Sequence, residues 1–182
     1  MSKIFYTSDI HFGHANVIKY SKRPFDSVEE MNEGLIKIWN SKVSDLDTVY
    51  ILGDMFNKFD KSPEIYLKRL NGNKILIKGN HEDWLKDKSL EKYFDGIYNY
   101  LEIKDAGRDL VLFHFPIIEW NNKNKGTIHL YGHVHNMRSK ESFQIYEKEN
   151  AFNVGVDVND LEPCTLDEII KKKKEKKFDV YI

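Results

Sequence analysis

Residues 7–14 read TSDIHFGH and place one aspartate and two histidines directly after the apolar residues 4–6. A short apolar run that ends in polar residues is typical of a buried strand followed by a loop. Five further runs have the same form. The six predicted strands lie within residues 3–9, 48–54, 74–80, 109–115, 127–133 and 151–158. Because most of these runs are apolar at successive positions, we expect sheets that are covered on both faces.

Three helices are predicted from their end signals. Ser27 and Glu30 form a capping box at the start of the first, and Ser62-Pro63 begins a second that ends at Asn71-Gly72. Thr165 and Glu168 form another capping box, for a lysine-rich helix over about 166–177. The first half of the chain therefore alternates strand and helix.

Two hairpins are predicted in the second half of the chain. KDAGRD at residues 104–109 reads as a turn between YLEI and LVLFH. Residues 148–150 are expected to join SFQIY, residues 142–146, to the last strand in the same way. This half of the chain is thus predicted to run from strand to strand.

Length and composition indicate a single domain over residues 1–182. The chain has 28 lysines and arginines against 29 acidic residues, so its net charge favours neither a nucleic acid nor a membrane as partner. Its one cysteine, Cys164, excludes an intrachain disulfide and a thiolate metal cluster, and we expect it to be inert. The sequence contains no apolar run of about 18 residues and no signal peptide, so the expected location is cytoplasmic.

Five consecutive predicted strands carry Asp, His or Asn at their carboxyl ends. In open α/β sheets this edge is where ligands bind, so these side chains are expected to meet in one crevice. Glycines 53, 79 and 132 stand at the strand-to-loop turns, where a missing side chain allows a sharp exit. The residues are Asp9 and His11, then Asp54, then Asn80 and His81, then His114, then His133 and His135.

Metal ions would remove the strain of placing these groups together. Carboxylates repel one another at short range, and buried histidines lose solvation. The donors are oxygen and nitrogen only, which suits Mn, Fe, Zn, Co or Ni. The candidate donors are seven, all of these residues except His81. Seven are too many for one four-coordinate zinc and about right for two ions that share a bridging carboxylate, for which we select Asp54. With two anionic ligands, two divalent ions would leave a site charge of about +2, or about +1 with a hydroxide, and would attract an anion.

The ordered motifs D-x-H, G-D, G-N-H-E, H and G-H-x-H resemble those of the calcineurin-like metallophosphoesterase superfamily. The stretches SDIHFGHANVI, RPF and EMNEGLI are similar to a small bacterial and phage branch of it. The resemblance implies an α/β (α+β) fold, a four-layer α/β/β/α sandwich with two mixed β-sheets. It also implies a dinuclear metal centre, with manganese as the ion expected in vitro, and hydrolysis of phosphate esters.

Carried over to this sequence, the resemblance assigns each candidate a role. Asp9, His11 and His135 would hold one ion, Asn80, His114 and His133 the other, and Asp54 would bridge them. A metal-bridging hydroxide would attack phosphorus in line, and His81 would protonate the leaving oxygen. Asn80 could also orient the substrate.

Two departures from the family pattern affect these expectations. Phe115-Pro116 follows His114 where many relatives have glycine, and this pair could shape a pocket wall. MFNKF follows Asp54 in place of the arginine-containing extension of the Ser/Thr protein phosphatases, which argues against protein dephosphorylation.

Other residues have competing interpretations. His14 could contact substrate or cap the next helix, and Arg23 could grip phosphate oxygens or lie in solvent. Asn153 and Asp157 are expected to support the ligands from behind. Packing is the favoured role of Trp84 and Trp120, His129 is expected to be structural, and the terminal lysines read as a solvated face rather than a nucleic-acid site.

The favoured function is a phosphodiesterase that acts on a nucleotide or another small phosphate ester. A nuclease or RNA-end phosphatase is one alternative, because no inserted cap domain is visible and the cleft is expected to be open. A non-catalytic metal-binding scaffold is an alternative from a different class. Filled ligand positions and the presence of His81 argue against it.

Overall fold

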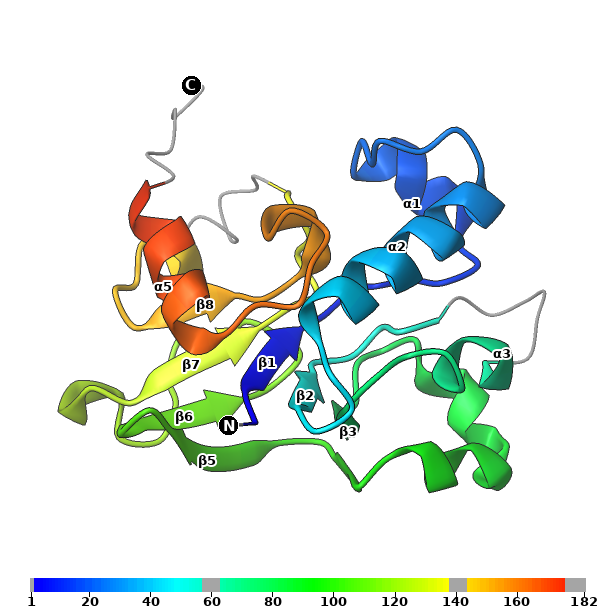
Figure 1. The fold of residues 1–182 in the computed structure, drawn as a ribbon. Helices are drawn as coiled ribbons and strands as arrows, with labels where there is room; N and C mark the ends of the chain where they lie inside the picture. Colours follow the sequence, from blue (N-terminus) through cyan, green and yellow to red (C-terminus); the bar gives the residue numbers. More distant parts are fainter. Residues whose placement is uncertain (1, 57–62, 138–143, 176–182) are drawn as a thin grey trace.

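The computed structural model describes residues 2–56, 63–137 and 144–175, which form two four-stranded sheets (Figure 1). The first sheet has the strand order β1-β2-β3-β4, and its strands are all parallel. They are β1 (Ile4–Thr7), β2 (Thr48–Ile51), β3 (Asn73–Ile77) and β4 (Gly96–Tyr98).

The second sheet has the order β5-β6-β7-β8. Only the β5–β6 pair is antiparallel, whereas β6–β7 and β7–β8 are parallel. These strands are β5 (Leu101–Asp105), β6 (Arg108–Leu112), β7 (Ile128–Tyr131) and β8 (Ala151–Asn153). The expected α/β fold with two sheets is confirmed. The expectation that both are mixed is wrong for the first sheet, because helices and long crossovers return each of its described strands in the same direction.

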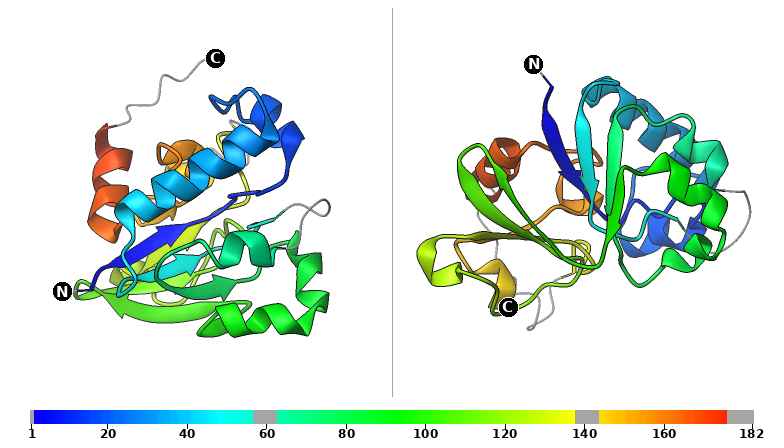
Figure 2. Two further views of the ribbon diagram at one scale, coloured as in Figure 1. Left: turned by 45° about the vertical axis from the view of Figure 1, so that its right-hand side comes forward. Right: turned by 90° about the horizontal axis from the view of Figure 1, so that it is seen from below.

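Helices cover the outer face of the first sheet, as Figure 2 shows. The α-helices are α1 (Ala15–Tyr20), α2 (Val28–Lys42), α3 (Glu64–Leu67) and α5 (Leu166–Glu175). Short 3₁₀ helices occupy Glu82–Lys86, Lys88–Tyr93, Lys123–Lys125 and Val156–Val158. In contrast to the others, α5 packs against β8 and β1, and its Leu166 and Ile169 enter the core between the sheets.

The core follows the two-residue alternation of the strands. On β1, Phe5 packs with the α2 layer, while Tyr6 lies between the sheets. On β6, Leu110 and Leu112 face the first sheet, while Val111 faces outward against Trp120 and other apolar residues. Both sheets are therefore covered on both faces, as the continuous apolar runs predicted.

One predicted hairpin is confirmed. Asp105 of β5 pairs with Arg108 of β6, and Ala106 and Gly107 between them have φ of 48° and 76°. Two successive left-handed residues are typical of the tight turn that suits the twist of a hairpin.

The other predicted hairpin is wrong. Residues 144–146 are helical, and Ile145 is buried on the outer face of the second sheet; residues 142–143 lie outside the described ranges. Strand β8 instead pairs in parallel with β7. A run as short as SFQIY is compatible with either a strand or a helix, and here the packing of Ile145 against the sheet decides.

The predicted caps are present. The Ser27 side chain accepts a hydrogen bond from the Glu30 amide at 3.1 Å, and Glu168 and Thr165 cap one another reciprocally. The second predicted helix is shorter than expected, since Pro63 stands at the cap of α3 and Ser62 lies outside the described residues. Helix α5 begins at Leu166, and positions 176–177 of its predicted range are likewise not described. Within the described ranges, none of the helices combines the length and apolar character that a bilayer span requires.

Candidate metal centre

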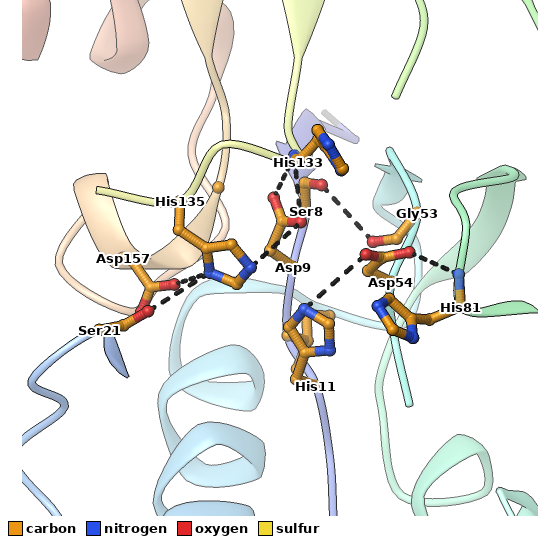
Figure 3. Close-up of polar contacts among 12 residues, drawn as sticks. Ser8, Asp9, His11, Ser21, Gly53, Asp54, His81, His133, His135 and Asp157 are labelled. Atoms are coloured by element: carbon orange, nitrogen blue, oxygen red, sulfur yellow. Dashed lines mark hydrogen bonds and ion pairs between the residues drawn. The ribbon is translucent and has the colours of Figure 1, made fainter. Parts of the chain in front are cut away.

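Five of the seven candidate ligands stand on sharp backbone turns at the carboxyl ends of β1, β2 and β7. Asp9, His11, Asp54, His133 and His135 all have left-handed φ, between 49° and 69°. This conformation is unfavourable for residues other than glycine, and such residues concentrate at functional sites. Figure 3 shows the side chains of Asp9, His11, Asp54 and His135 gathered beside one another.

Asp9, His11 and His135 form the first ligand group. One donor atom of each lies within 4.8 Å of the others, and Nε2 of His135 is 3.9 Å from Oδ1 of Asp9. The Asp9 carboxylate is buried, and both of its oxygens accept the single N–H of the His133 amide in a bifurcated hydrogen bond, at 3.1 and 2.9 Å. Behind His135, Asp157 contacts Nδ1 at 2.6 Å, so that Nε2 is directed toward the other ligands.

Asp54, His114 and His133 form the second ligand group, by the same criterion of 4.8 Å. His114 is buried, and its Nδ1 donates to the Leu52 carbonyl at 2.6 Å. Its Nε2 lies 3.1 Å from Oδ1 of Asn80, which brings Asn80 to this group.

Asp54 lies between the two groups. Its Oδ2 is 3.8 Å from Nε2 of His11 in the first group and 3.6 Å from Nε2 of His114 in the second. Its Oδ1 accepts a hydrogen bond from the His81 amide at 3.0 Å. The seven predicted ligands are thus brought together, with Asp54 in the position that a bridging carboxylate would require.

Burial controls the charge of these groups. It raises the pKa of Asp9 to about 6, with the nearby Asp54 adding to the rise, and it lowers the pKa of His11 to about 2. Burial also lowers the pKa of His114 and of His133. For His135, burial alone would lower the pKa, but the hydrogen bond with Asp157 and the charge of Asp9 raise it. Burial therefore favours the neutral form of the His11, His114 and His133 rings, whereas the His135 ring is held in a more anionic environment by Asp157 and Asp9.

The donor atoms fit divalent cations. A neutral His114 has one N–H, which Leu52 accepts, so its Nε2 carries a lone pair that faces the acceptor Oδ1 of Asn80 at 3.1 Å. Two acceptors that face one another are repulsive unless a cation lies between them. A cation would likewise relieve the repulsion between the buried carboxylates of Asp9 and Asp54. Neutral imidazoles and carboxylates are ligands that Mn, Fe, Zn and Co accept.

Two further histidines lie beside the ligands. The His81 ring is half-buried and 5.5 Å from the His11 ring, centroid to centroid. The half-buried His14 ring is 5.4 Å from His11. His14 occupies the N-cap position of α1, as one interpretation predicted, although its side chain makes no capping hydrogen bond; a substrate contact stays a prediction.

Arg23 does not have the predicted environment. Its side chain is 1% exposed, and its guanidinium is engaged by Asp157 and by the carbonyls of Asp9 and Ile10. Every nitrogen of the group has a partner inside the protein, so the predicted phosphate contact does not fit this geometry.

The remaining predictions concern packing. Trp84 packs edge-on against Phe56, and Trp120 is buried with its Nε1 donating to Thr127, as expected. His129 is buried between Trp120 and Tyr131, in a structural role. Burial raises the pKa of Cys164 to about 11, in line with an inert thiol.

Glu82 was missed by the sequence interpretation, although it is the fourth residue of the G-N-H-E motif. Its Oε1 accepts a hydrogen bond from the Asp54 amide at 2.6 Å and so holds the left-handed turn that presents Asp54. Burial and the nearby Asp54 carboxylate raise the pKa of Glu82 to about 7.

Comparisons with known proteins agree with this site. The family model for the calcineurin-like phosphoesterases matches residues 2–180. An uncharacterised protein of Methanocaldococcus jannaschii is 42% identical over 174 residues, which cover 94% of this chain and 91% of that protein. The gene 66 protein of Mycobacterium phage L5 is 32% identical over 163 residues, covering 74% and 78% of the two chains.

A solved structure is similar over the whole fold. The crystal structure of a protein of unknown function from Aquifex aeolicus superposes with a TM-score of 0.73 at 28% identity and covers 94% of this chain and 99% of that one. Together with the match over residues 2–180 and the two ligand groups, these likenesses identify the chain as a member of the calcineurin-like phosphoesterase family.

Proposed function

We propose that the protein is a dinuclear-metal-dependent phosphodiesterase that hydrolyses a nucleotide or another small phosphate ester. The observation that carries this proposal is the pair of ligand groups on either side of Asp54, with the His81 ring beside them. Two divalent ions bound there would supply an acidified water as nucleophile and would neutralise charge on the phosphoryl oxygens.

The protein's own residues would then perform three tasks. Asp54 would fix the distance between the two ligand groups, because its carboxylate lies near a histidine of each. Asn80, which is exposed, could orient a phosphoryl oxygen while it completes the second group. His81 would donate the proton that the leaving oxygen requires, and its half-buried ring at the edge of the ligands suits that task.

The test is hydrolysis of bis-p-nitrophenyl phosphate and p-nitrophenyl phosphate by metal-stripped protein to which Mn²⁺ is returned. We expect Mn²⁺-dependent cleavage of the diester, which His81→Ala and Asp54→Asn lower by about 10²-fold or more. Asp109→Asn changes an exposed aspartate that pairs with Lys104 at 3.4 Å near the start of β6, the opposite end of that strand from His114, and serves as the matched control.

Each outcome has a clear meaning. Cleavage of the monoester alone would replace the diesterase by a phosphatase. Protein that binds two ions but turns over neither ester with Mn²⁺, Fe²⁺, Co²⁺, Ni²⁺ or Zn²⁺ would contradict the enzymatic proposal and favour the scaffold.

A further inference from the structure

The linker between α1 and α2 carries a buried arginine that the proposed chemistry does not use. Arg23 Nε donates to Oδ1 of Asp157 at 2.7 Å, and Nη2 donates to Oδ2 of Asp157 at 3.1 Å. Both side chains of the pair are only 1% exposed. Removing two charges from water is costly, so a buried charge pair does not by itself indicate a gain in folding stability. We therefore consider whether the Arg23–Asp157 pair has a functional role.

The same guanidinium holds the turn that follows β1. Nη2 donates to the Asp9 carbonyl and Nη1 donates to the Ile10 carbonyl, each at 2.7 Å. These peptide groups lie between the left-handed residues Asp9 and His11, whose φ are 56° and 54°. Arg23 therefore fixes a backbone conformation that is unfavourable by itself and that aims two candidate ligands.

Asp157 extends the contact to the third ligand of the first group. Its Oδ2 contacts Nδ1 of His135 at 2.6 Å, and Figure 3 shows the carboxylate on the side of the ring away from Asp9. Ser21, from the same linker as Arg23, approaches the same nitrogen at 3.4 Å. A carboxylate behind a histidine ligand sets the orientation of the ring and strengthens it as a donor.

The second ligand group is held differently. His114 is oriented by the Leu52 carbonyl, and Asp54 by the amide of His81. Each of the described contacts of the Arg23 guanidinium goes to Asp157, Asp9, Ile10 or Met31, and none goes to the second group. The buried pair thus contacts Asp9 and His135 directly and holds the Ile10 carbonyl in the peptide bond that precedes His11, whereas none of its described contacts goes to the second group.

We propose that Arg23 and Asp157 are positioning residues that set the affinity of the Asp9–His11–His135 site for a divalent cation and leave the other site unaffected. This inference rests on the proposed function, since it presupposes two metal sites. It predicts that the two sites respond unequally to changes in the α1–α2 linker.

The test measures Mn²⁺ binding by the metal-free full-length protein, with calorimetry and the electron paramagnetic resonance signal of free Mn²⁺. The variants are Arg23→Lys and Asp157→Glu, which conserve charge so that no buried charge is left unpaired. We expect one of two ions to bind about 10- to 100-fold more weakly, while the other keeps its affinity. Arg69→Lys is the matched control, because Arg69 forms a similar two-bond pair with Glu33, at 2.7 and 2.6 Å, on the surface.

Two backgrounds identify the affected site. In a His133→Ala background, which disables the second group, Arg23→Lys should weaken the remaining ion by the same factor. In an Asp9→Asn background, which disables the first group, it should change the affinity of the remaining ion by less than about twofold, given that only the first group contacts the pair.

The outcomes separate the two proposals. A wild-type protein that fails to bind two ions would overturn the proposed function. Folded variants that bind both ions with wild-type affinity would overturn the positioning role alone, even if their melting temperatures fall, because a purely structural pair predicts that pattern. Unfolding of either charge-conserving variant, judged by circular dichroism, would also contradict it, since the pair would then be needed for the fold itself.

Discussion

At the scale of single residues, the candidate centre is built from unfavourable backbone conformations. Five of its ligands are left-handed non-glycine residues, each of which costs about 1–3 kcal/mol. Three of these residues, Asp9, His11 and Asp54, lie side by side, since the His11 amide donates to the Asp54 carbonyl at 3.0 Å. Arg23 holds the turn at Asp9, and Glu82 holds the turn at Asp54. The surrounding hydrogen bonds therefore offset the conformational free energy that these backbone turns require.

Gly53 has a requirement of the same kind, and it can be tested. Its φ is 84°, and an added Cβ would lie 2.5 Å from Nδ1 of His114 and 2.7 Å from the backbone of Gly79. We expect Gly53→Ala to lower the free energy of unfolding by about 3 kcal/mol or more, from strain and overpacking together. It should also weaken Mn²⁺ binding, because His114 would have to move.

The matched control is Gly107→Ala. Gly107 has a similar φ of 76°, but an added Cβ meets nothing within 4 Å. Only the conformational cost of about 1–2 kcal/mol is expected there, with no effect on metal binding. If urea unfolding shows the same decrease in the free energy of unfolding for Gly53→Ala and Gly107→Ala, the contact with His114 does not matter.

At the scale of elements, the sequence predicted those that carry a periodic apolar signal. Strands β1, β2, β7 and β8 lie within the predicted runs, and β3 and β6 begin one residue before theirs; each of these strands buries side chains. Strand β4 was not predicted: its three residues carry little signal of their own, and it exists because the edge of β3 pairs with Gly96–Tyr98. The helical residues 144–146 were misread for a related reason, since Ile145 is buried by tertiary packing that no local pattern records.

The candidate ligands could be predicted from the sequence more readily than the residues that hold them in place. Ligands at strand ends follow from the topology, which is why the seven predicted donors meet. The burial of Arg23 does not follow, because an arginine in a loop is ordinarily solvated. Its partner Asp157 lies 134 positions away, so no spacing pattern could link them.

His129 gives the middle of β7 a pH-dependent stability. Its Nδ1 faces the Val111 carbonyl and its Nε2 faces the Ile117 amide, each at 3.4 Å, which suits a neutral ring with one donor and one acceptor. Burial lowers the pKa of His129 to about 4. A protonated ring would direct a second N–H at the Ile117 amide.

The sign of the effect follows from linkage. The unfolded chain binds a proton at His129 near pH 6.5 and the folded chain only near pH 4, so stability falls as the pH is lowered through this window. The loss is at most about 1.4 kcal/mol per pH unit. In urea unfolding at pH 7, 6 and 5, wild type should lose more stability than His129→Gln, whereas parallel curves would contradict the prediction. Other histidines titrate alike in both proteins, so the difference isolates His129.

At the scale of the whole molecule, the centre joins the two sheets. Asp9, His11 and Asp54 come from the ends of first-sheet strands, whereas His114, His133 and His135 follow strands of the second. Each ligand group has members from both sheets. Bound ions would therefore act as cross-links between the two halves of the sandwich.

Added metal should accordingly raise thermal stability. At a free Mn²⁺ concentration of about 100 times the dissociation constant, each ion contributes roughly 2.7 kcal/mol. For a domain of this size, each kcal/mol corresponds to roughly 2–4 °C in melting temperature. We expect an upward shift with MnCl₂ that EDTA reverses, that Asp54→Asn reduces and that Asp109→Asn leaves unchanged. An unchanged melting temperature in saturating Mn²⁺, Fe²⁺ and Zn²⁺ would contradict the cross-link.

The chain passes from the first sheet to the second at Asn99 and Tyr100, between β4 and β5. During synthesis, neither ligand group can close before the second sheet has emerged from the ribosome, because each group includes histidines from residue 114 onward. A polypeptide divided at this junction would place incomplete ligand sets on its two fragments. Fused to two interacting partners, such fragments would regain metal binding only on reassembly, which makes the junction a natural place to build a split reporter.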